Sequence, residues 1–79
     1  MKFERISINP AIMLGKPCIR GTRITVELIL EKLGGGGSIE YLLEAYPHIT
    51  KEDIFEAINY ANAVLKNEDI EEILINVNG

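Results

Sequence analysis

Cys18 and His48 are the two side chains that could support nucleophilic catalysis, because the chain contains one cysteine and one histidine. A thiol becomes an effective nucleophile when an imidazole lies within hydrogen-bond reach and nearby donors stabilise the developing charge. Each of the two residues follows a proline, and neither stands in a glycine-rich segment of the kind that forms an oxyanion hole. We therefore expect a buried or turn thiol, an exposed loop histidine and no catalytic site.

Metal and phosphate sites are also disfavoured. A structural zinc site normally needs four ligands, and one cysteine with one histidine cannot supply them. The glycine run Gly34–Gly37 precedes a predicted helix, whose N-terminus could attract an anion. The phosphate-loop pattern is absent, however, because no Lys-Ser or Lys-Thr pair follows the glycines. We interpret the run as a flexible link and predict no metal or other cofactor.

Arg20 and Arg23 flank the pair Gly21-Thr22. Gly21 and Thr22 could occupy the two central positions of a type II′ hairpin turn, in which the first position favours glycine. Arg20 would then face Arg23 across the hairpin, and a bound phosphate or carboxylate would relieve the repulsion between them. The alternative is that both guanidinium groups extend separately into solvent. Arg20, Thr22 and Arg23 are therefore candidate phosphate-binding residues.

The segment before these arginines is predicted to be extended or looped. Ile6 and Ile8 alternate with polar residues, which indicates a short strand, and Pro10 stops it because proline has no N–H for a sheet. Residues 11–25 show no helical periodicity.

Two helices are predicted after this segment. Thr25 can cap the first and Ser38 the second, because an N-cap hydroxyl accepts a hydrogen bond from the first helical turn. The apolar residues that follow have the spacing of one helix face: Val26, Ile29, Leu30 and Leu33 in the first helix, and Ile39, Leu42, Leu43 and Tyr46 in the second. Gly34 is expected to end the first helix in the left-handed conformation, and Pro47 to stop the second.

A third helix begins at a capping box, since Thr50 and Asp53 have the [ST]-x-x-[DE] spacing. Its predicted apolar stripe continues to about Lys66: Ile54, Phe55, Ile58, Ala61 and Leu65. The tight connection 46–49 between the second and third helices indicates a helix-turn-helix arrangement. Such an arrangement would place Thr50 and Lys51 at DNA, although the helix is acidic and phosphate attraction would depend on the basic first half of the chain.

The composition is that of one small domain with an uneven charge. The 79 residues carry a net charge of −4, but residues 1–32 hold six basic and three acidic side chains, and residues 33–79 hold two basic and nine acidic ones. There is no signal peptide and no apolar run long enough for a membrane span, so we expect a cytoplasmic protein. Because so short a chain buries little surface alone, we also expect a homodimer.

The chain divides into a single helix-turn-helix domain with an N-terminal extended arm, residues 1–66, and a C-terminal tail, residues 67–79. The tail is acidic and apolar together, and its spacing fits either a helix or a strand. We predict that it binds a partner through Glu68, Ile70, Glu71, Ile73, Leu74, Ile75 and Val77.

Three motifs at characteristic separations carry a family resemblance: Gly15-Lys-Pro17, Arg20-Gly-Thr-Arg23, and the stretch Tyr46-Pro-His-Ile-Thr50. From about Asn9 to Leu65 the sequence resembles the small bacterial and archaeal domain-of-unknown-function family numbered 433. The resemblance implies a mainly α, homeodomain-like bundle of three helices with a short N-terminal β segment or hairpin. It also implies the antitoxin half of a toxin–antitoxin pair, which inhibits a PIN-like ribonuclease toxin and binds its own operator DNA through Arg20, Thr22, Arg23, Thr50 and Lys51.

Two other readings remain open. The chain could be a stand-alone DNA-binding transcriptional regulator, or a homo-oligomeric interaction module that binds no nucleic acid. A basic protein that copurifies with the chain would favour the inhibitor, whereas a DNA fragment shifted by the isolated chain would favour the regulator.

Overall fold

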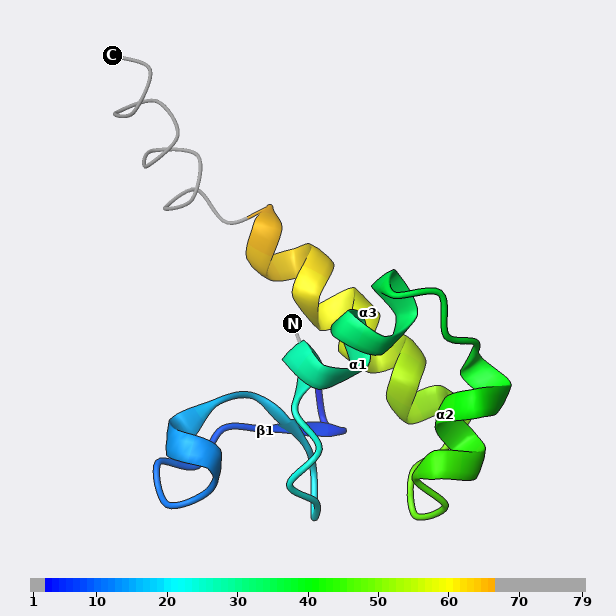
Figure 1. Ribbon diagram of the computed structural model, residues 1–79. Helices are drawn as coiled ribbons and strands as arrows, with labels where there is room; N and C mark the ends of the chain where they lie inside the picture. Colours follow the sequence, from blue (N-terminus) through cyan, green and yellow to red (C-terminus); the bar gives the residue numbers. More distant parts are fainter. Residues whose placement is uncertain (1–2, 67–79) are drawn as a thin grey trace.

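The computed structural model describes residues 3–66 as three helices that follow a short two-stranded antiparallel sheet (Figure 1). The elements are β1 (Ile6–Ser7), the 3-10 turn η1 (Met13–Gly15), β2 (Cys18–Ile19), α1 (Val26–Gly34), α2 (Ile39–Ala45) and α3 (Lys51–Leu65). β1 and β2 pair with Ile6 opposite Ile19 and Ser7 opposite Cys18. The predicted mainly helical fold with a short N-terminal β segment is confirmed.

All three helices begin at the predicted hydroxyl caps. The side-chain oxygens of Thr25, Ser38 and Thr50 each accept a hydrogen bond from the backbone N–H three residues further on, at 2.9, 3.0 and 3.1 Å. At α3 the capping box is complete, because the carboxylate of Asp53 also accepts a hydrogen bond from the Thr50 N–H at 2.9 Å. These caps satisfy N–H groups that have no partner within the helix, and so they fix where each helix starts.

The glycine run after α1 is an ordered cap, which differs from the predicted flexible link. Gly36 donates its N–H to the carbonyl of Leu33 at 3.1 Å, and Gly37 donates to that of Lys32 at 2.9 Å, the two hydrogen bonds of a Schellman motif. The left-handed residue of the motif is Gly36, with φ +99°, so the prediction that Gly34 has this role is wrong. Gly34 instead belongs to the last turn of α1. The run therefore sets the direction in which the chain leaves α1.

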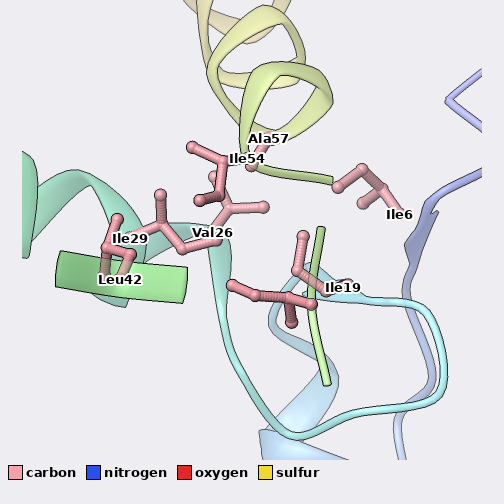
Figure 2. Packing of buried hydrophobic residues seen from close by; sticks show 8 residues of the cluster. Ile6, Ile19, Val26, Ile29, Leu42, Ile54 and Ala57 are labelled. Atoms are coloured by element: carbon pink, nitrogen blue, oxygen red, sulfur yellow. The ribbon is translucent and has the colours of Figure 1, made fainter. Parts of the chain in front are cut away.

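The core lies between the strand pair and the three helices (Figure 2). Its buried apolar side chains are Ile6, Ile19, Val26, Ile29, Leu42, Ile49, Ile54 and Ala57. The N-terminal arm is fastened to α3 by an ion pair of 3.1 Å between Arg5 and Asp53, and by a T-shaped contact between the rings of Phe3 and Tyr60. The core of the described residues is thus built from the arm and the helices together.

Parts of the predicted apolar stripes face solvent instead of the core. Phe55 and Leu65 of α3 are exposed, as are Leu30 of α1 and Ile8 beyond β1. The apolar stripes of α1 and α3 are wider than the area that the other elements of residues 3–66 cover. The prediction that Leu30, Phe55 and Leu65 belong to buried helix faces is therefore wrong.

Among the helices of residues 3–66, none combines the length and the apolar character that crossing a membrane would require.

Candidate partner-binding surfaces

The turn that carries Arg20 and precedes Arg23 lies one residue earlier than predicted. It spans Ile19–Thr22, with a hydrogen bond of 3.0 Å from the Thr22 N–H to the Ile19 carbonyl. Gly21 occupies its third position with φ +81°, where a type II turn requires a positive φ. The Thr22 hydroxyl donates to the same carbonyl at 2.8 Å and accepts from the Ile24 N–H at 3.0 Å. These side-chain bonds favour this register over a turn centred on Gly21 and Thr22.

Arg20 is consequently used by the fold. Its guanidinium donates hydrogen bonds to the backbone carbonyls of Glu4 and Ile6, the second at 3.0 Å. The backbone N–H of Arg20 donates to the Arg5 carbonyl at 2.7 Å. Arg20 thereby ties the turn to the N-terminal arm. It does not form the predicted cross-strand pair with Arg23.

Arg23 and Lys51 are the predicted DNA-binding residues that keep a free charged group. Both side chains are exposed, and neither forms a hydrogen bond or ion pair with another residue of the range 3–66. Thr50 is also exposed, but its hydroxyl serves as the N-cap of α3.

The arm lies between the two groups of predicted DNA-binding residues. Arg20 is bonded to the carbonyls of residues 4–6, while Arg5 is bonded to Asp53 and Glu56 in the first half of α3. The same N-terminal arm is therefore attached to two elements. One is the turn with Arg20 and Thr22, and the other is the start of α3 with Thr50 and Lys51. The acidic side chains there already neutralise part of the positive charge of the arm.

Cys18 lies in the interior, which agrees with the expectation of a buried or turn thiol. Its side chain is 1% exposed, and its thiol donates a hydrogen bond of 3.3 Å to the Lys16 carbonyl. Burial raises the pKa of the Cys18 thiol above its ordinary value, because the apolar surroundings disfavour the thiolate. His48 stands in the exposed turn before α3. Within residues 3–66 no group of three His, Cys, Asp or Glu side chains is placed to hold a metal ion.

An apolar groove runs between α1 and the C-terminal half of α3. It has a volume of about 530 Å³ and is lined by Pro17, Val26, Glu27, Leu30, Glu31, Tyr60, Ala61, Val64 and Leu65. We call it the α1–α3 groove. Leu30, Val64 and Leu65 are each more than a third exposed there, and Leu65 is 68% exposed. Because these exposed aliphatic side chains gather in one groove, we treat the groove as a candidate contact site.

The second unusual surface is the turn Met13–Gly15, which we call the tip. Met13, Leu14 and Gly15 have φ values of +50°, +59° and +81°, the left-handed region that non-glycine residues rarely adopt. The Leu14 side chain is 93% exposed. Sequence reasoning missed the tip, because leucine and methionine give no signal for a positive φ and the flanking Pro10 and Gly15 indicate only a loop.

A small charged hollow separates the tip from α1. It has a volume of about 340 Å³ and is lined by Met13, Lys16, Arg23, Thr25, Glu27, Leu28 and Glu31. Across it, the Lys16 ammonium and the Glu27 carboxylate form an ion pair of 2.9 Å. The hydrogen bond to Glu27, followed by the charge of that carboxylate, raises the pKa of Lys16. The tip is thus held beside the acidic side of α1.

The predicted partner-binding residues Glu68, Ile70, Glu71, Ile73, Leu74, Ile75 and Val77 lie outside the described residues. Their assignment stays a prediction.

Comparisons with known proteins identify relatives of this chain. An uncharacterized protein, y4eO, of Sinorhizobium fredii (strain NBRC 101917 / NGR234) is 38% identical over 60 residues, which are 76% of this chain and 27% of that protein. The chain thus spans about a quarter of the length of this curated relative. The crystal structure of a DUF433 member protein from Anabaena variabilis ATCC 29413 superposes with a TM-score of 0.75 at 33% sequence identity, covering 85% of this chain and 66% of the other.

The family described as "Protein of unknown function (DUF433)" matches residues 6–61, which include the tip, the arginine turn and most of the helical bundle. The chain therefore belongs to the DUF433 family.

Proposed function

We propose that this chain is the antitoxin component of a toxin–antitoxin pair, a binding module that neutralises a PIN-like ribonuclease in the cytoplasm. The observation that carries the proposal is the composition of residues 67–79, in which four acidic side chains between Glu68 and Glu72 are followed by the aliphatic side chains of Ile73, Leu74, Ile75 and Val77. Among residues 3–66, the buried apolar cluster already joins the N-terminal arm to all three helices. We therefore assign the acidic and apolar side chains of the tail to a partner.

The chemistry of the tail suits a ribonuclease. An enzyme that cleaves RNA must attract a polyanion, so its active groove carries positive charge or metal ions. The four acidic residues between Glu68 and Glu72 can be attracted to such a groove, and the aliphatic side chains that follow them can anchor the contact. Inhibition would then result from occupying the site where RNA binds.

The burial of Cys18 favours a binding module over an enzyme that uses this cysteine as its nucleophile. A catalytic cysteine is exposed to its substrate and has a lowered pKa, whereas burial raises the pKa of this thiol. The thiol is instead a buried group of β2 that donates a hydrogen bond to the Lys16 carbonyl.

DNA binding is the second candidate function, as autoregulation by the antitoxin or as the role of a stand-alone regulator. It is supported by the position of Arg20, Thr22, Thr50 and Lys51 around one arm, and by the exposed charge of Arg23, which has no ion-pair partner among residues 3–66. Because Asp53 and Glu56 share this surface, we expect contacts to phosphates in preference to bases, and a weak affinity that falls steeply with salt. A homo-oligomeric module without nucleic acid would show no such affinity.

The proposal is tested by co-expressing the chain with its partner nuclease. We expect the double variant Ile73→Asp, Leu74→Asp to lose protection, because a charge at an apolar anchor prevents its burial. The matched control is Asn76→Asp, Asn78→Asp, which adds the same charge to the same segment at polar positions and should still protect. Cell growth and RNA integrity are measured. Full protection by the Ile73, Leu74 variant would contradict the mechanism and move the interface to the helices.

A further inference from the structure

We propose that two copies of this chain form a symmetric dimer in which the tip of each copy inserts Leu14 into the α1–α3 groove of the other. The inference concerns the assembly of the domain and does not depend on the proposed antitoxin function.

The tip carries two unfavourable features at once. A leucine in the left-handed region costs roughly 1–2 kcal/mol relative to the right-handed one, and Leu14 has φ +59°. Its exposed side chain recovers none of this cost by burial within the described residues. Strain of this kind persists in folded proteins where the strained residue is used, and burial against a second molecule would offset it.

Hydrogen bonds hold the tip in this shape before any partner binds. The N–H of Ile12 donates to the Asn9 carbonyl at 2.8 Å, that of Gly15 to the Ile12 carbonyl at 3.0 Å, and that of Lys16 to the Met13 carbonyl at 3.1 Å. Figure 1 shows the tip, in blue, projecting away from the three helices. A projecting side chain on an ordered turn loses little conformational entropy on binding, which favours its use as an anchor.

The α1–α3 groove has the complementary properties. It is shallow and mainly aliphatic, and the exposed parts of Leu30, Val64 and Leu65 have no apolar cover from the other residues of the range 3–66. Because the groove is open to solvent, an apolar side chain at the end of a turn can reach its floor. One molecule therefore presents both an apolar projection and an apolar groove.

The two features share one side of α1. Glu27 and Glu31 line both the α1–α3 groove and the charged hollow beneath the tip. A twofold dimer requires that a patch be complementary to itself, so that each projection meets the other copy's groove. The continuous surface from the tip across Glu27 and Glu31 to Leu65 meets this requirement.

The charges on this surface also favour a second copy as the partner. Lys16 and Arg23 line the charged hollow, and Glu27 and Glu31 line both the hollow and the groove. Because Lys16 and Glu27 form an ion pair within one copy, Arg23 and Glu31 are the charged residues of this surface left for a second copy. When the tip of one copy enters the groove of the other, Arg23, which has no ion-pair partner within residues 3–66, would form an ion pair with Glu31 of the second copy.

The test uses two variants of the full chain and one control, measured by sedimentation equilibrium. Leu14→Asn removes the apolar anchor and is compatible with the fold, since asparagine tolerates the left-handed region better than leucine. Val64→Gln, Leu65→Gln makes the groove polar with residues that favour helices. Phe55→Gln is the control, because Phe55 is a similarly exposed apolar residue of α3 that lies outside the groove.

We expect the wild type and Phe55→Gln to be dimers, and the tip and groove variants each to raise the dimer dissociation constant at least about tenfold. Circular dichroism at low concentration should show Leu14→Asn to be folded and no less stable than the wild type. A monomeric wild type would overturn the proposal, and so would a wild-type dimer that tolerates either variant.

Mixing the two variants tests the reciprocal arrangement. A mixed dimer combines the intact tip of the groove variant with the intact groove of the tip variant, and so keeps one of two contacts. Each variant alone keeps neither. We expect the mixture to associate more tightly than either variant alone, and the absence of this gain would overturn the exchange of tips.

Discussion

Arg20 illustrates how the fold can use a residue whose type and spacing point to a ligand. Sequence reasoning leaves two placements open for Arg20: opposite Arg23, where a phosphate would relieve their repulsion, or extended separately into solvent. The structure instead bonds its guanidinium to the carbonyls of Glu4 and Ile6. The difference arises from the Thr22 hydroxyl, whose bonds to Ile19 and Ile24 set the turn one residue earlier. Two preferences compete here: the Thr22 hydroxyl favours one position of the turn, and Gly21 is suited to either. The sequence alone does not show which position is more stable.

The two arginines should therefore differ in their effect on stability. We expect Arg20→Ala to lower the free energy of unfolding by about 1 kcal/mol through the loss of hydrogen bonds from a charged donor. For a domain of this size that is a fall of about 4–8 °C in Tm. Arg23→Ala should leave Tm unchanged at low protein concentration, since Arg23 has no partner within residues 3–66. Thermal melts of both variants check this, and equal shifts would contradict the assigned contacts.

Cys18 should make stability depend on pH in the alkaline range. The folded state raises the pKa of its thiol, so above about pH 8.5 the unfolded chain loses a proton that the folded chain retains. Deprotonation then favours unfolding. We expect the wild type to lose stability relative to Cys18→Ala as the pH rises from 8 to 10, in denaturant unfolding measured at each pH. The same burial should leave the native thiol much slower than the denatured one to react with iodoacetamide, and equal rates would contradict it.

At the scale of elements, the helix starts could be predicted because they are determined locally. The side chains of Thr25, Ser38 and Thr50 each accept a hydrogen bond from the N–H three residues later. Both partners therefore lie within one short stretch of sequence, where a pattern can identify them. What could not be predicted depends on distant parts of the chain. Leu30 and Leu65 have the helical spacing of the predicted stripes, yet within residues 3–66 no element covers them. The spacing alone does not indicate how far the core extends. The strained tip gave no sequence signal at all.

The glycine run allows a comparison within one element. A methyl group at Gly34 would meet no atom within 4 Å, whereas at Gly37 it would lie 2.8 Å from the Lys32 carbonyl oxygen, and Gly36 has φ +99°. We expect Gly34→Ala to stabilise the protein by about 0.5–1 kcal/mol, since alanine favours helix over glycine. Gly36→Ala and Gly37→Ala should each destabilise it by about 1 kcal/mol or more. Chemical denaturation of the three variants checks the order, and three equal effects would show that the run is a flexible link.

At the scale of the whole molecule, a function must explain two features: the uneven distribution of charge along the chain and the exposed apolar side chains. The first 32 residues are basic and the remainder is acidic. Within residues 3–66, apolar side chains are exposed at the tip and in the groove. Sequence reasoning predicted the helical bundle, which the structure confirms, whereas the need for partners stays a prediction. The positions of the exposed apolar surfaces required the structure, because they depend on which helix faces the other described elements leave uncovered.

The measurement that tests the central claim most directly is inhibition of RNA cleavage by purified components. The full chain is titrated into a fixed amount of the PIN-like nuclease, and cleavage of a labelled RNA is followed. We expect cleavage to fall in proportion to added chain and to stop at a fixed stoichiometry, as it does when a tight inhibitor occupies the active groove. The Ile73→Asp, Leu74→Asp variant should leave cleavage intact at the same ratio. Undiminished cleavage with the wild-type chain in about tenfold excess over the nuclease would contradict the antitoxin function.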